Sequence, residues 1–308
     1  MKDFAGKTAF ITGGGSGAAL GQAKVFSDAG MKIVIADIRQ DHIDEALAYF
    51  RKKNAAVHGV KLDVTDREAY ARAADETEKV FGTPELLCLT AGVNSFGPIE
   101  KATYDDWDWL MDVNLKGVIN GMVTWVPRMI KAGKGGHIMA TSSMGGFMGS
   151  GGAGPYSAAK AAVNNMMEGY RQNLANYNPP IGVSVLCPAN INSRIYEAIK
   201  TRPAKYPNSG FIETQETIDT LKNIHKDGMD PVELAQWTKK AIEENQFWIL
   251  PYPESKMMLE SRFKAILDSV RKASPEEEAR MKQRMEEMRT RATPTSRPRI
   301  FTMGKDDI

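Results

Sequence analysis

Short, nearly unbroken apolar runs alternate with longer segments of helical periodicity from Thr8 to about Pro251. The runs are rich in β-branched residues, which is typical of strands buried on both faces of a parallel sheet. This alternation requires right-handed crossovers, so it predicts an α/β fold with a single doubly wound parallel sheet. The runs are TAFIT from Thr8, KIVIAD from Lys32, AVHGVKL from Ala56, ELLCLT from Glu85, HIMATS from His137, GVSVLC from Gly182 and FWILP from Phe247. The helix candidates are residues 22–29, 41–53, 66–81, 105–131, 156–176 and 231–244.

Two segments lie outside this alternation. Residues 189–229 form a long insertion with Pro203, Pro207 and Gly210, and an insertion of that length in a compact domain is usually a lid or a binding segment. Residues 255–308 are highly charged, and Ser274-Pro275 followed by three glutamates predicts a helix start. We therefore expect one domain over 1–254 and a charged helical extension over 255–308, whose last residues, 293–308, form a flexible or extended arm.

The bulk properties exclude several classes of function. The 308 residues carry a net charge of +2, which argues against a nucleic-acid surface, and no apolar run approaches the roughly 20 residues of a membrane span. The four histidines lack metal-site spacing, so no metal is expected. The start lacks the features of a signal peptide, and Cys88 and Cys187 end apolar runs, as reduced core residues would. These features together predict a cytoplasmic protein.

A glycine-rich stretch, ITGGGSGAALG from Ile11, joins the first predicted strand to the first helix. Glycines at this place allow a tight turn and let backbone N–H groups approach a pyrophosphate at the helix N-terminus. The next strand ends in Asp37, whose carboxylate can accept hydrogen bonds from the adenosine ribose hydroxyls and would repel a 2′-phosphate. Arg39 lies close enough to soften that preference. The pattern predicts a dinucleotide site that takes NAD, with NADP the weaker alternative.

Ser143, Tyr156 and Lys160 are spaced so that a predicted fold of this kind could bring their side chains together. Tyr156 and Lys160 are four residues apart at a helix start and so share one helix face, and Ser143 lies at the carboxyl end of the predicted strand HIMATS, directly after it. Alone, such a pair would indicate only a surface helix. Oxidising an alcohol, however, requires removal of its hydroxyl proton, and a lysine ammonium is expected to lower the tyrosine pKa from about 10. We expect Tyr156 to be the acid/base and Ser143 to hold the substrate oxygen.

With these motifs in place, the chain resembles the short-chain dehydrogenase/reductase family over roughly residues 3–252. TGGGSG from Thr12, LDV from Leu62, TAGV from Thr90, VNL from Val113 and YSAAK from Tyr156 occur in the family's order and spacing. The resemblance implies a seven-stranded Rossmann sheet, a nicotinamide cofactor and the catalytic residues Asn114, Ser143, Tyr156 and Lys160, with the asparagine kinking its helix. Together with the glycine turn, it implies cofactor contacts from Gly13, Gly15, Ser16, Gly17, Ala18, Asp37, Arg39, Asp63, Val64, Ala91, Gly92, Val93, Tyr156, Lys160, Pro188, Ile191 and Ser193.

The sequence departs from the family pattern at three places. Ala19 replaces the third glycine of the phosphate loop, with Gly21 following, and we expect its methyl group to weaken cofactor binding. Thr90 replaces an asparagine, which puts one structural hydrogen bond in doubt. The stretch after the sixth strand reads CPANINS in place of proline-glycine and a threonine.

Longer stretches, including TAGVNSFGPIEKATYDDWDW and RPAKYPNSGF, resemble the bacterial Cα-dehydrogenases of lignin β-aryl ether catabolism. That resemblance implies oxidation of a benzylic Cα alcohol to the ketone with NAD. The substrate would be a small aromatic alcohol in an apolar pocket. Family habit also implies a homodimer or homotetramer. Candidate pocket residues are Phe96, Met144, Phe147, Met148, Tyr196, Tyr206 and Phe211.

Three alternatives remain open. The first is a short-chain dehydrogenase for another secondary alcohol or ketone, such as a steroid or polyol, which only substrate assays separate. The second is a catalytically inactive NAD-sensing regulator, which need not retain Ser143, Tyr156 and Lys160. The third is a methyltransferase with a related glycine turn, in which the tyrosine and lysine would have no role.

Overall fold

The computed structural model describes residues 1–211 and 214–291, and the predicted arm at 293–308 lies outside these ranges. The chain divides into two compact units, Met1–Pro253 and Glu254–Ile308. The first unit contains the sheet and every predicted site residue.

Seven parallel strands form one sheet in the order β3-β2-β1-β4-β5-β6-β7, which confirms the predicted doubly wound fold. The strands are β1 (Thr8–Thr12), β2 (Lys32–Asp37), β3 (Val57–Lys61), β4 (Leu86–Leu89), β5 (Gly136–Thr141), β6 (Ile181–Leu186) and β7 (Trp248–Ile249). In register, Ile11 of β1 lies between Ile35 of β2 and Cys88 of β4. The strand order reverses between β1 and β4, and ligands of such sheets bind at the carboxyl ends of the strands beside this switch point.

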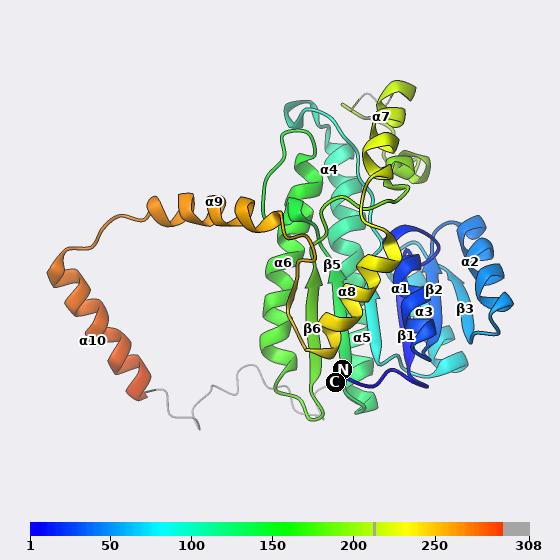
Figure 1. Ribbon diagram of the computed structural model, residues 1–308, viewed down its shortest axis with the longest axis horizontal. Coiled ribbons are helices and arrows are strands. Elements are labelled where there is room, and N and C mark those ends of the chain that lie inside the picture. The colour runs from blue at the N-terminus through cyan, green and yellow to red at the C-terminus, as the bar shows by residue number, and fades with distance from the viewer. Residues whose placement is uncertain (212–213, 292–308) are drawn as a thin grey trace. The chain divides into compact units, whose positions relative to one another are not determined.

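Helices cover both faces of the sheet (Figure 1). Helices α1 (Gly17–Asp28), α2 (Gln40–Lys52) and α8 (Pro231–Glu243) share one buried apolar cluster with one side of the strands. On the other side α3 (Arg67–Phe81), α5 (Gly117–Ala132) and α6 (Gly154–Leu174) contribute to a second cluster. The strands therefore present apolar residues on both faces, which is why their sequences are unbroken apolar runs.

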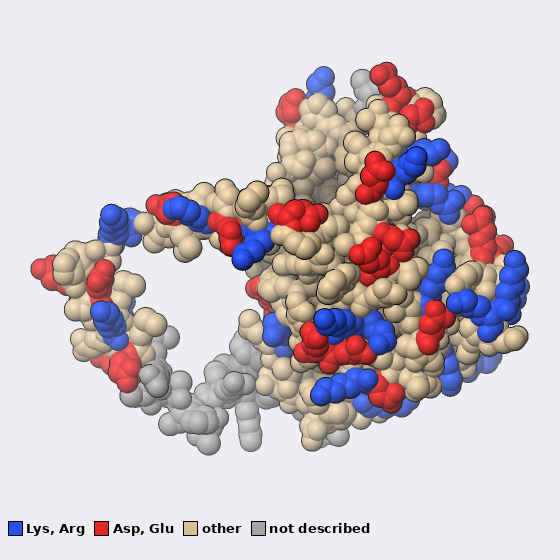
Figure 2. Space-filling model, in the orientation of Figure 1, with Lys and Arg blue, Asp and Glu red and all other residues tan. Residues whose placement is uncertain are grey.

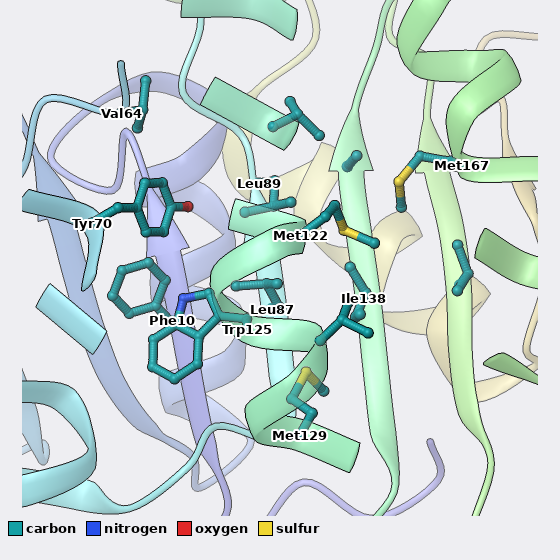
Figure 3. Packing of buried hydrophobic residues seen from close by; sticks show 14 of the residues in the cluster. Phe10, Val64, Tyr70, Leu87, Leu89, Met122, Trp125, Met129, Ile138 and Met167 are labelled. Carbon is teal, nitrogen blue, oxygen red and sulfur yellow. The ribbon is translucent and has the colours of Figure 1, made fainter. Parts of the chain in front are cut away.

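The second cluster is centred on α5. Figure 3 shows Met122, Trp125 and Met129 of this helix packed onto the sheet, and the Trp125 ring lies 5.1 Å from the Phe10 ring, centroid to centroid. Trp125 and Phe10 are fully buried. Burial of large aromatic side chains contributes about 1.5–3 kcal/mol each, so this contact fixes α5 and the helix leading into it against the sheet.

The predicted helix over 105–131 is interrupted. The structure has α4 (Tyr104–Met111), one π-helical turn, η2 (Asp112–Lys116), and then α5. The Asn114 side chain donates from Nδ2 to the Leu110 carbonyl at 2.9 Å, an acceptor four residues earlier that a regular helix bonds through its backbone. The π-helical turn thus lies at Asn114, the residue at which the resemblance implied a kinked helix.

The insertion is more ordered than its composition predicts. It contains a 3₁₀ helix, η4 (Ile195–Thr201), and α7 (Gln215–Lys226), whose first turn is capped by the Thr214 side chain. Helix α1 also begins earlier than predicted, at Gly17 rather than Gln22, because the end of the glycine-rich stretch forms its first turn.

The second unit is helical in its described part. It contains α9 (Ser255–Asp268) and α10 (Pro275–Arg291), and Ser274 Oγ accepts a hydrogen bond from Glu277 N at the predicted start of α10.

None of the described helices is long and apolar enough to cross a membrane. Among the described residues no group of three or more His, Cys, Asp or Glu could hold a metal ion. Lys and Arg side chains are mixed with Asp and Glu over the face in Figure 2.

Candidate active site

A cavity of about 220 Å³ lies at the switch point between β1 and β4. Every residue of the predicted cofactor set except Gly15 lines it, from Asp37 at the end of β2 to Tyr156 and Lys160 on α6. Residues of the insertion line it as well, among them Glu197 and Tyr206. The structure therefore gathers residues from most of the sheet and from the insertion around one space.

The glycine-rich turn has the geometry of a phosphate cradle. Gly13 and Gly17 have φ angles of +69° and +52°, which L-residues with a side chain rarely adopt. A Cβ on Gly13 would lie 3.0 Å from the Ala91 Cα, and one on Gly15 would lie 2.6 Å from the His42 Cβ. The turn leads directly into the N-terminus of α1, where backbone N–H groups favour an anion. These residues fit the pyrophosphate of a dinucleotide.

Gly21 explains the departure at Ala19. A Cβ on Gly21 would lie 2.2 Å from the Pro231 carbonyl oxygen. Helices α1 and α8 are therefore so close at this point that only a glycine fits. Ala19 itself is buried and belongs to the apolar cluster on that face of the sheet. The glycine needed for close helix packing thus stands two residues later than in the family pattern.

Asp37 helps to fix the loop as well as facing the cavity. Its Oδ2 accepts from Gly15 N at 3.0 Å, and its Oδ1 accepts from Arg39 N at 3.0 Å. The Arg39 guanidinium is paired with the carboxylate of Asp41 and lies 4.0 Å from Glu197. The charge of Arg39 is therefore already balanced by two carboxylates, those of Asp41 and Glu197, which makes this arginine less available to bind a 2′-phosphate.

Tyr156 lines the cavity, whereas Ser143 is in contact with the Tyr156 hydroxyl and is not among the residues that line the cavity. A hydrogen bond with Ser143 lowers the pKa of Tyr156, but burial raises it by more, so the net pKa lies above the ordinary value of 10.0. Ser143 Oγ also accepts from Gly145 N at 3.0 Å, which orients the serine. The sequence predicted a lowered pKa for Tyr156, and this prediction is wrong. Burial of the phenol raises the pKa by more than the hydrogen bond with Ser143 lowers it.

Lys160 is 2% exposed and donates from Nζ to the Thr141 carbonyl at 2.8 Å. Its Nζ lies 5.5 Å from the centroid of the Tyr156 ring. Burial lowers the pKa of Lys160 from 10.5 to about 8. The lysine is thus held beside the tyrosine by a backbone oxygen at the end of β5, a partner that no sequence pattern indicates.

Asn114 and Thr90 support the strand ends. Asn114 is fully buried, and its side chain donates to the Val93 carbonyl at 2.9 Å and accepts from Val93 N at 3.2 Å. A Cβ on Gly92 would lie 2.8 Å from Asn114 Oδ1 and 3.5 Å from Lys160 Nζ, so the two side chains approach the same point. Thr90 Oγ1 donates to Gln22 Oε1 at 2.8 Å, so its hydroxyl forms a structural hydrogen bond where the family has an asparagine.

Of the substrate candidates, Tyr206 alone lines this cavity in the described part of the chain. Phe147 packs against Trp248, with ring centroids 5.1 Å apart, and Tyr196 stacks on His225 on the outer side of the glycine loop. Phe211 belongs to a small apolar cluster behind the cavity. The other candidates are Met144, which is buried, and Phe96 and Met148, which are partly buried.

The sequence reasoning missed several lining residues. Trp109 and Val113 come from α4 and η2, and His42 comes from α2. Arg194 Nη2 lies 3.1 Å from His42 Nε2, and because arginine can only donate, this imidazole nitrogen accepts. Neither Trp109 nor His42 could be identified from spacing, because only folding brings Trp109 to the cavity and His42 to the glycine loop.

The glycine cradle fits a dinucleotide, and Tyr156 and Lys160 line the same cavity, with Ser143 in contact with Tyr156. A dinucleotide cradle next to an acid/base tyrosine is what a nicotinamide-dependent oxidoreductase requires. The family model described as short chain dehydrogenase matches residues 7–204, and the chain belongs to that family.

Three similar proteins, one known from its sequence and two from solved structures, are informative about this chain. A C alpha-dehydrogenase of Sphingobium sp. (strain NBRC 103272 / SYK-6) is 56% identical over 305 residues, covering 99% of this chain and 98% of the relative. The crystal structure of the apo form of LigD from the same strain is 53% identical with a TM-score of 0.74, over 88% of this chain and 100% of that one. A short chain dehydrogenase/reductase from Burkholderia phymatum, in complex with NAD, is 30% identical with a TM-score of 0.82, over 89% and 99% of the two chains.

Proposed function

We propose that this enzyme oxidises the secondary benzylic Cα alcohol of an arylglycerol-β-aryl ether, a lignin fragment, to the ketone with NAD. The observation that carries the proposal is that Tyr156 and Lys160 line the same cavity as the glycine-rich loop. The substrate class rests on the 56% identity to a C alpha-dehydrogenase over nearly the whole of both chains.

The roles of the side chains follow from their positions. Tyr156 is the general base that takes the alcohol proton at its phenolic oxygen, and Ser143, in contact with that oxygen, hydrogen-bonds the substrate oxygen. Lys160 places a cation beside the phenol and favours its ionised form. Asn114 holds the strand end next to Lys160. When bound, the oxidised nicotinamide supplies the hydride acceptor.

The preference for NAD over NADP is supported by the charges at the adenosine end. Asp37 is buried and faces the cavity, where a carboxylate suits ribose hydroxyls and repels a phosphate. Arg39 is already paired with Asp41 and Glu197. The relative from Burkholderia phymatum was crystallised with NAD, which agrees with this choice.

The substrate end of the cavity suits an aromatic ring. Trp109, Val113, Ala198 and Tyr206 line it, and such apolar and aromatic walls are typical of sites for small aromatic ligands. The proposed contacts of the enzyme with its substrate therefore lie on α4, η2 and the insertion.

NADH absorbance tests the proposal directly. Purified enzyme is mixed with an arylglycerol-β-guaiacyl ether, with NAD and NADP in parallel. We expect rapid NADH formation with NAD, loss of that activity in Tyr156→Phe, and retention in the control Tyr170→Phe on the same helix. Binding of NAD without any oxidation of the ether would refute the proposed substrate and leave the family assignment in place.

A cytoplasmic homodimer or homotetramer is also proposed. Val123 and Ile119 of α5 are 64% and 36% exposed, and an exposed apolar helix face favours association. Light scattering of the full chain would test this, and a monomer at working concentration would refute it.

A further inference from the structure

Residues 202–211 of the insertion are fastened to the start of α4 by a buried ion pair. Arg202 Nη1 lies 2.7 Å from Asp106 Oδ1, and the two side chains are 8% and 0% exposed. Burying two charges costs several kcal/mol unless geometry and further hydrogen bonds compensate. The ion pair can therefore hold the segment in place only if surrounding hydrogen bonds compensate for the burial of its charges.

Asp106 is saturated with donors. Its Oδ2 accepts from Thr103 N, Thr103 Oγ1 and Gly210 N, each at 2.9 Å, and its Oδ1 accepts from Arg202 and from Ser209 Oγ at 2.9 Å. Burial pushes the pKa of Asp106 up, but these hydrogen bonds outweigh it and hold the pKa below its ordinary value. The carboxylate therefore stays ionised and joins α4 to both ends of the 202–211 segment.

Arg202 makes the complementary contacts. Its Nε donates to the Tyr206 carbonyl at 2.8 Å, its Nη2 donates to the Asn208 carbonyl at 2.5 Å, and its guanidinium carbon lies 5.1 Å from the centroid of the Trp109 ring. Only an arginine offers this planar fork of donors together with a stacking face.

The residues that Arg202 touches belong to the substrate end of the cavity. Tyr206 and Trp109 both line it and share one buried apolar cluster with Ala198 and Phe211. The Tyr206 hydroxyl also donates to the Asp112 carboxylate at the start of η2, just before Val113 of the cavity wall. Arg202 is thus bonded to the backbone of one aromatic wall residue and stacked against the ring of the other.

We infer that the Arg202–Asp106 pair positions Tyr206 and Trp109 and thereby sets the affinity for substrates that carry a second aromatic ring. The inference rests on the proposed function, because the arylglycerol-β-aryl ether has a second ring beyond the reacting carbon. Neither residue touches the reacting atoms, so both act through the cavity wall.

The test compares two substrates in wild type and Arg202→Met at saturating NAD. One is the two-ring ether, and the other is α-methylbenzyl alcohol, which has one ring. We expect KM for the ether to rise about 10-fold, with kcat for both alcohols, KM for the one-ring alcohol and Kd for NAD nearly unchanged. Arg202→Lys, which keeps the charge but loses the fork, should restore part of the difference.

Lys222→Met is the matched control, because Lys222 is an exposed residue of α7 in the same insertion and does not line the cavity. Ser209→Ala is a milder variant that removes one donor to Asp106 and keeps the charges paired, so it should show the same pattern at smaller size if Arg202→Met folds poorly. Amide hydrogen exchange of residues 202–211, measured without substrate, should accelerate in Arg202→Met.

An equal change in KM for both alcohols, or no change for either, would overturn the specificity role. Unchanged hydrogen exchange over 202–211 would overturn the positioning role. If the wild-type enzyme oxidised α-methylbenzyl alcohol but not the ether, the proposed function would fail, and with it the specificity role, whereas faster exchange would still support the positioning role.

Discussion

Replacing Lys160 by methionine should abolish activity and yet stabilise the fold. Lys160 is 2% exposed, and among the described residues no carboxylate forms an ion pair with it. Its Nζ is held by a neutral carbonyl, that of Thr141. The folded protein therefore carries a buried ammonium whose desolvation is not compensated by an opposite charge.

The pKa of Lys160 sets the size of this effect. Burial lowers it from 10.5 to about 8, and at about 1.4 kcal/mol per pKa unit this difference corresponds to about 3 kcal/mol of destabilisation at neutral pH. Between the two pKa values the unfolded chain binds a proton at this lysine and the folded chain does not. Stability then rises with pH, so the penalty shrinks from about pH 8 to about pH 10.5.

Urea unfolding of wild type and Lys160→Met at about pH 7 and about pH 9.5 measures this change. At the higher pH about 1 kcal/mol of the penalty remains, so the stability advantage of the variant should fall by about 2 kcal/mol between the two conditions. The lost hydrogen bond to Thr141 and the altered packing are equal at both pH values and cancel from this comparison.

Lys79→Met serves as the control, because Lys79 is an exposed residue of α3. Its stability difference from wild type should be the same at both pH values. If the stability advantage of Lys160→Met did not change with pH, burial of the charged Lys160 side chain would not be what destabilises the wild-type fold.

Four further measurements follow from the site. Ser143→Ala should lower kcat by about 10²-fold, because one donor to the substrate oxygen is lost, while NAD affinity followed by fluorescence stays the same. In wild type, kcat/KM for oxidation should increase with pH towards the raised pKa of Tyr156, because the phenolate is the base; a flat profile would argue for another proton acceptor. Asp37→Ala should narrow the ratio of kcat/KM with NAD to that with NADP, and an unchanged ratio would place ribose recognition elsewhere. Gly21→Ala should destabilise by at least about 1–3 kcal/mol in thermal unfolding, because its Cβ would lie 2.2 Å from the Pro231 oxygen, and an unchanged Tm would mean that α8 shifts freely.

The sheet was predictable because parallel strands are buried on both faces and leave apolar runs in the sequence. The cofactor cradle was predictable for a related reason, since glycines are needed where a chain turns tightly, as Gly13 and Gly17 do with positive φ. Ser143, Tyr156 and Lys160 were visible through spacing, because each lies at a strand end or on one helix face.

The features that the sequence did not reveal depend on contacts between distant segments. Lys160 is held by the backbone oxygen of Thr141, and a carbonyl leaves no trace in residue identity. The pKa of Tyr156 depends on total burial, which spacing cannot supply. Arg202 and Asp106 are ordinary charged residues in the sequence, and only folding buries them together. The substrate candidates were chosen by aromatic character, which marks core packing as often as a pocket wall, and Phe147 packs against Trp248.

The strand order has a consequence for the growing chain. The neighbours of β1 are β2, which follows it directly, and β4, which comes only after β3 and α3. Because synthesis proceeds from the N-terminus, Gly15 and Asp37, whose side chain accepts from Gly15 N, both emerge early, within one βαβ unit. Tyr156 emerges after β5, and the wall residue Tyr206 emerges later still. The residues at the proposed adenosine end of the site are therefore synthesised well before those proposed to move the proton, and the cavity is complete only when the insertion has been made.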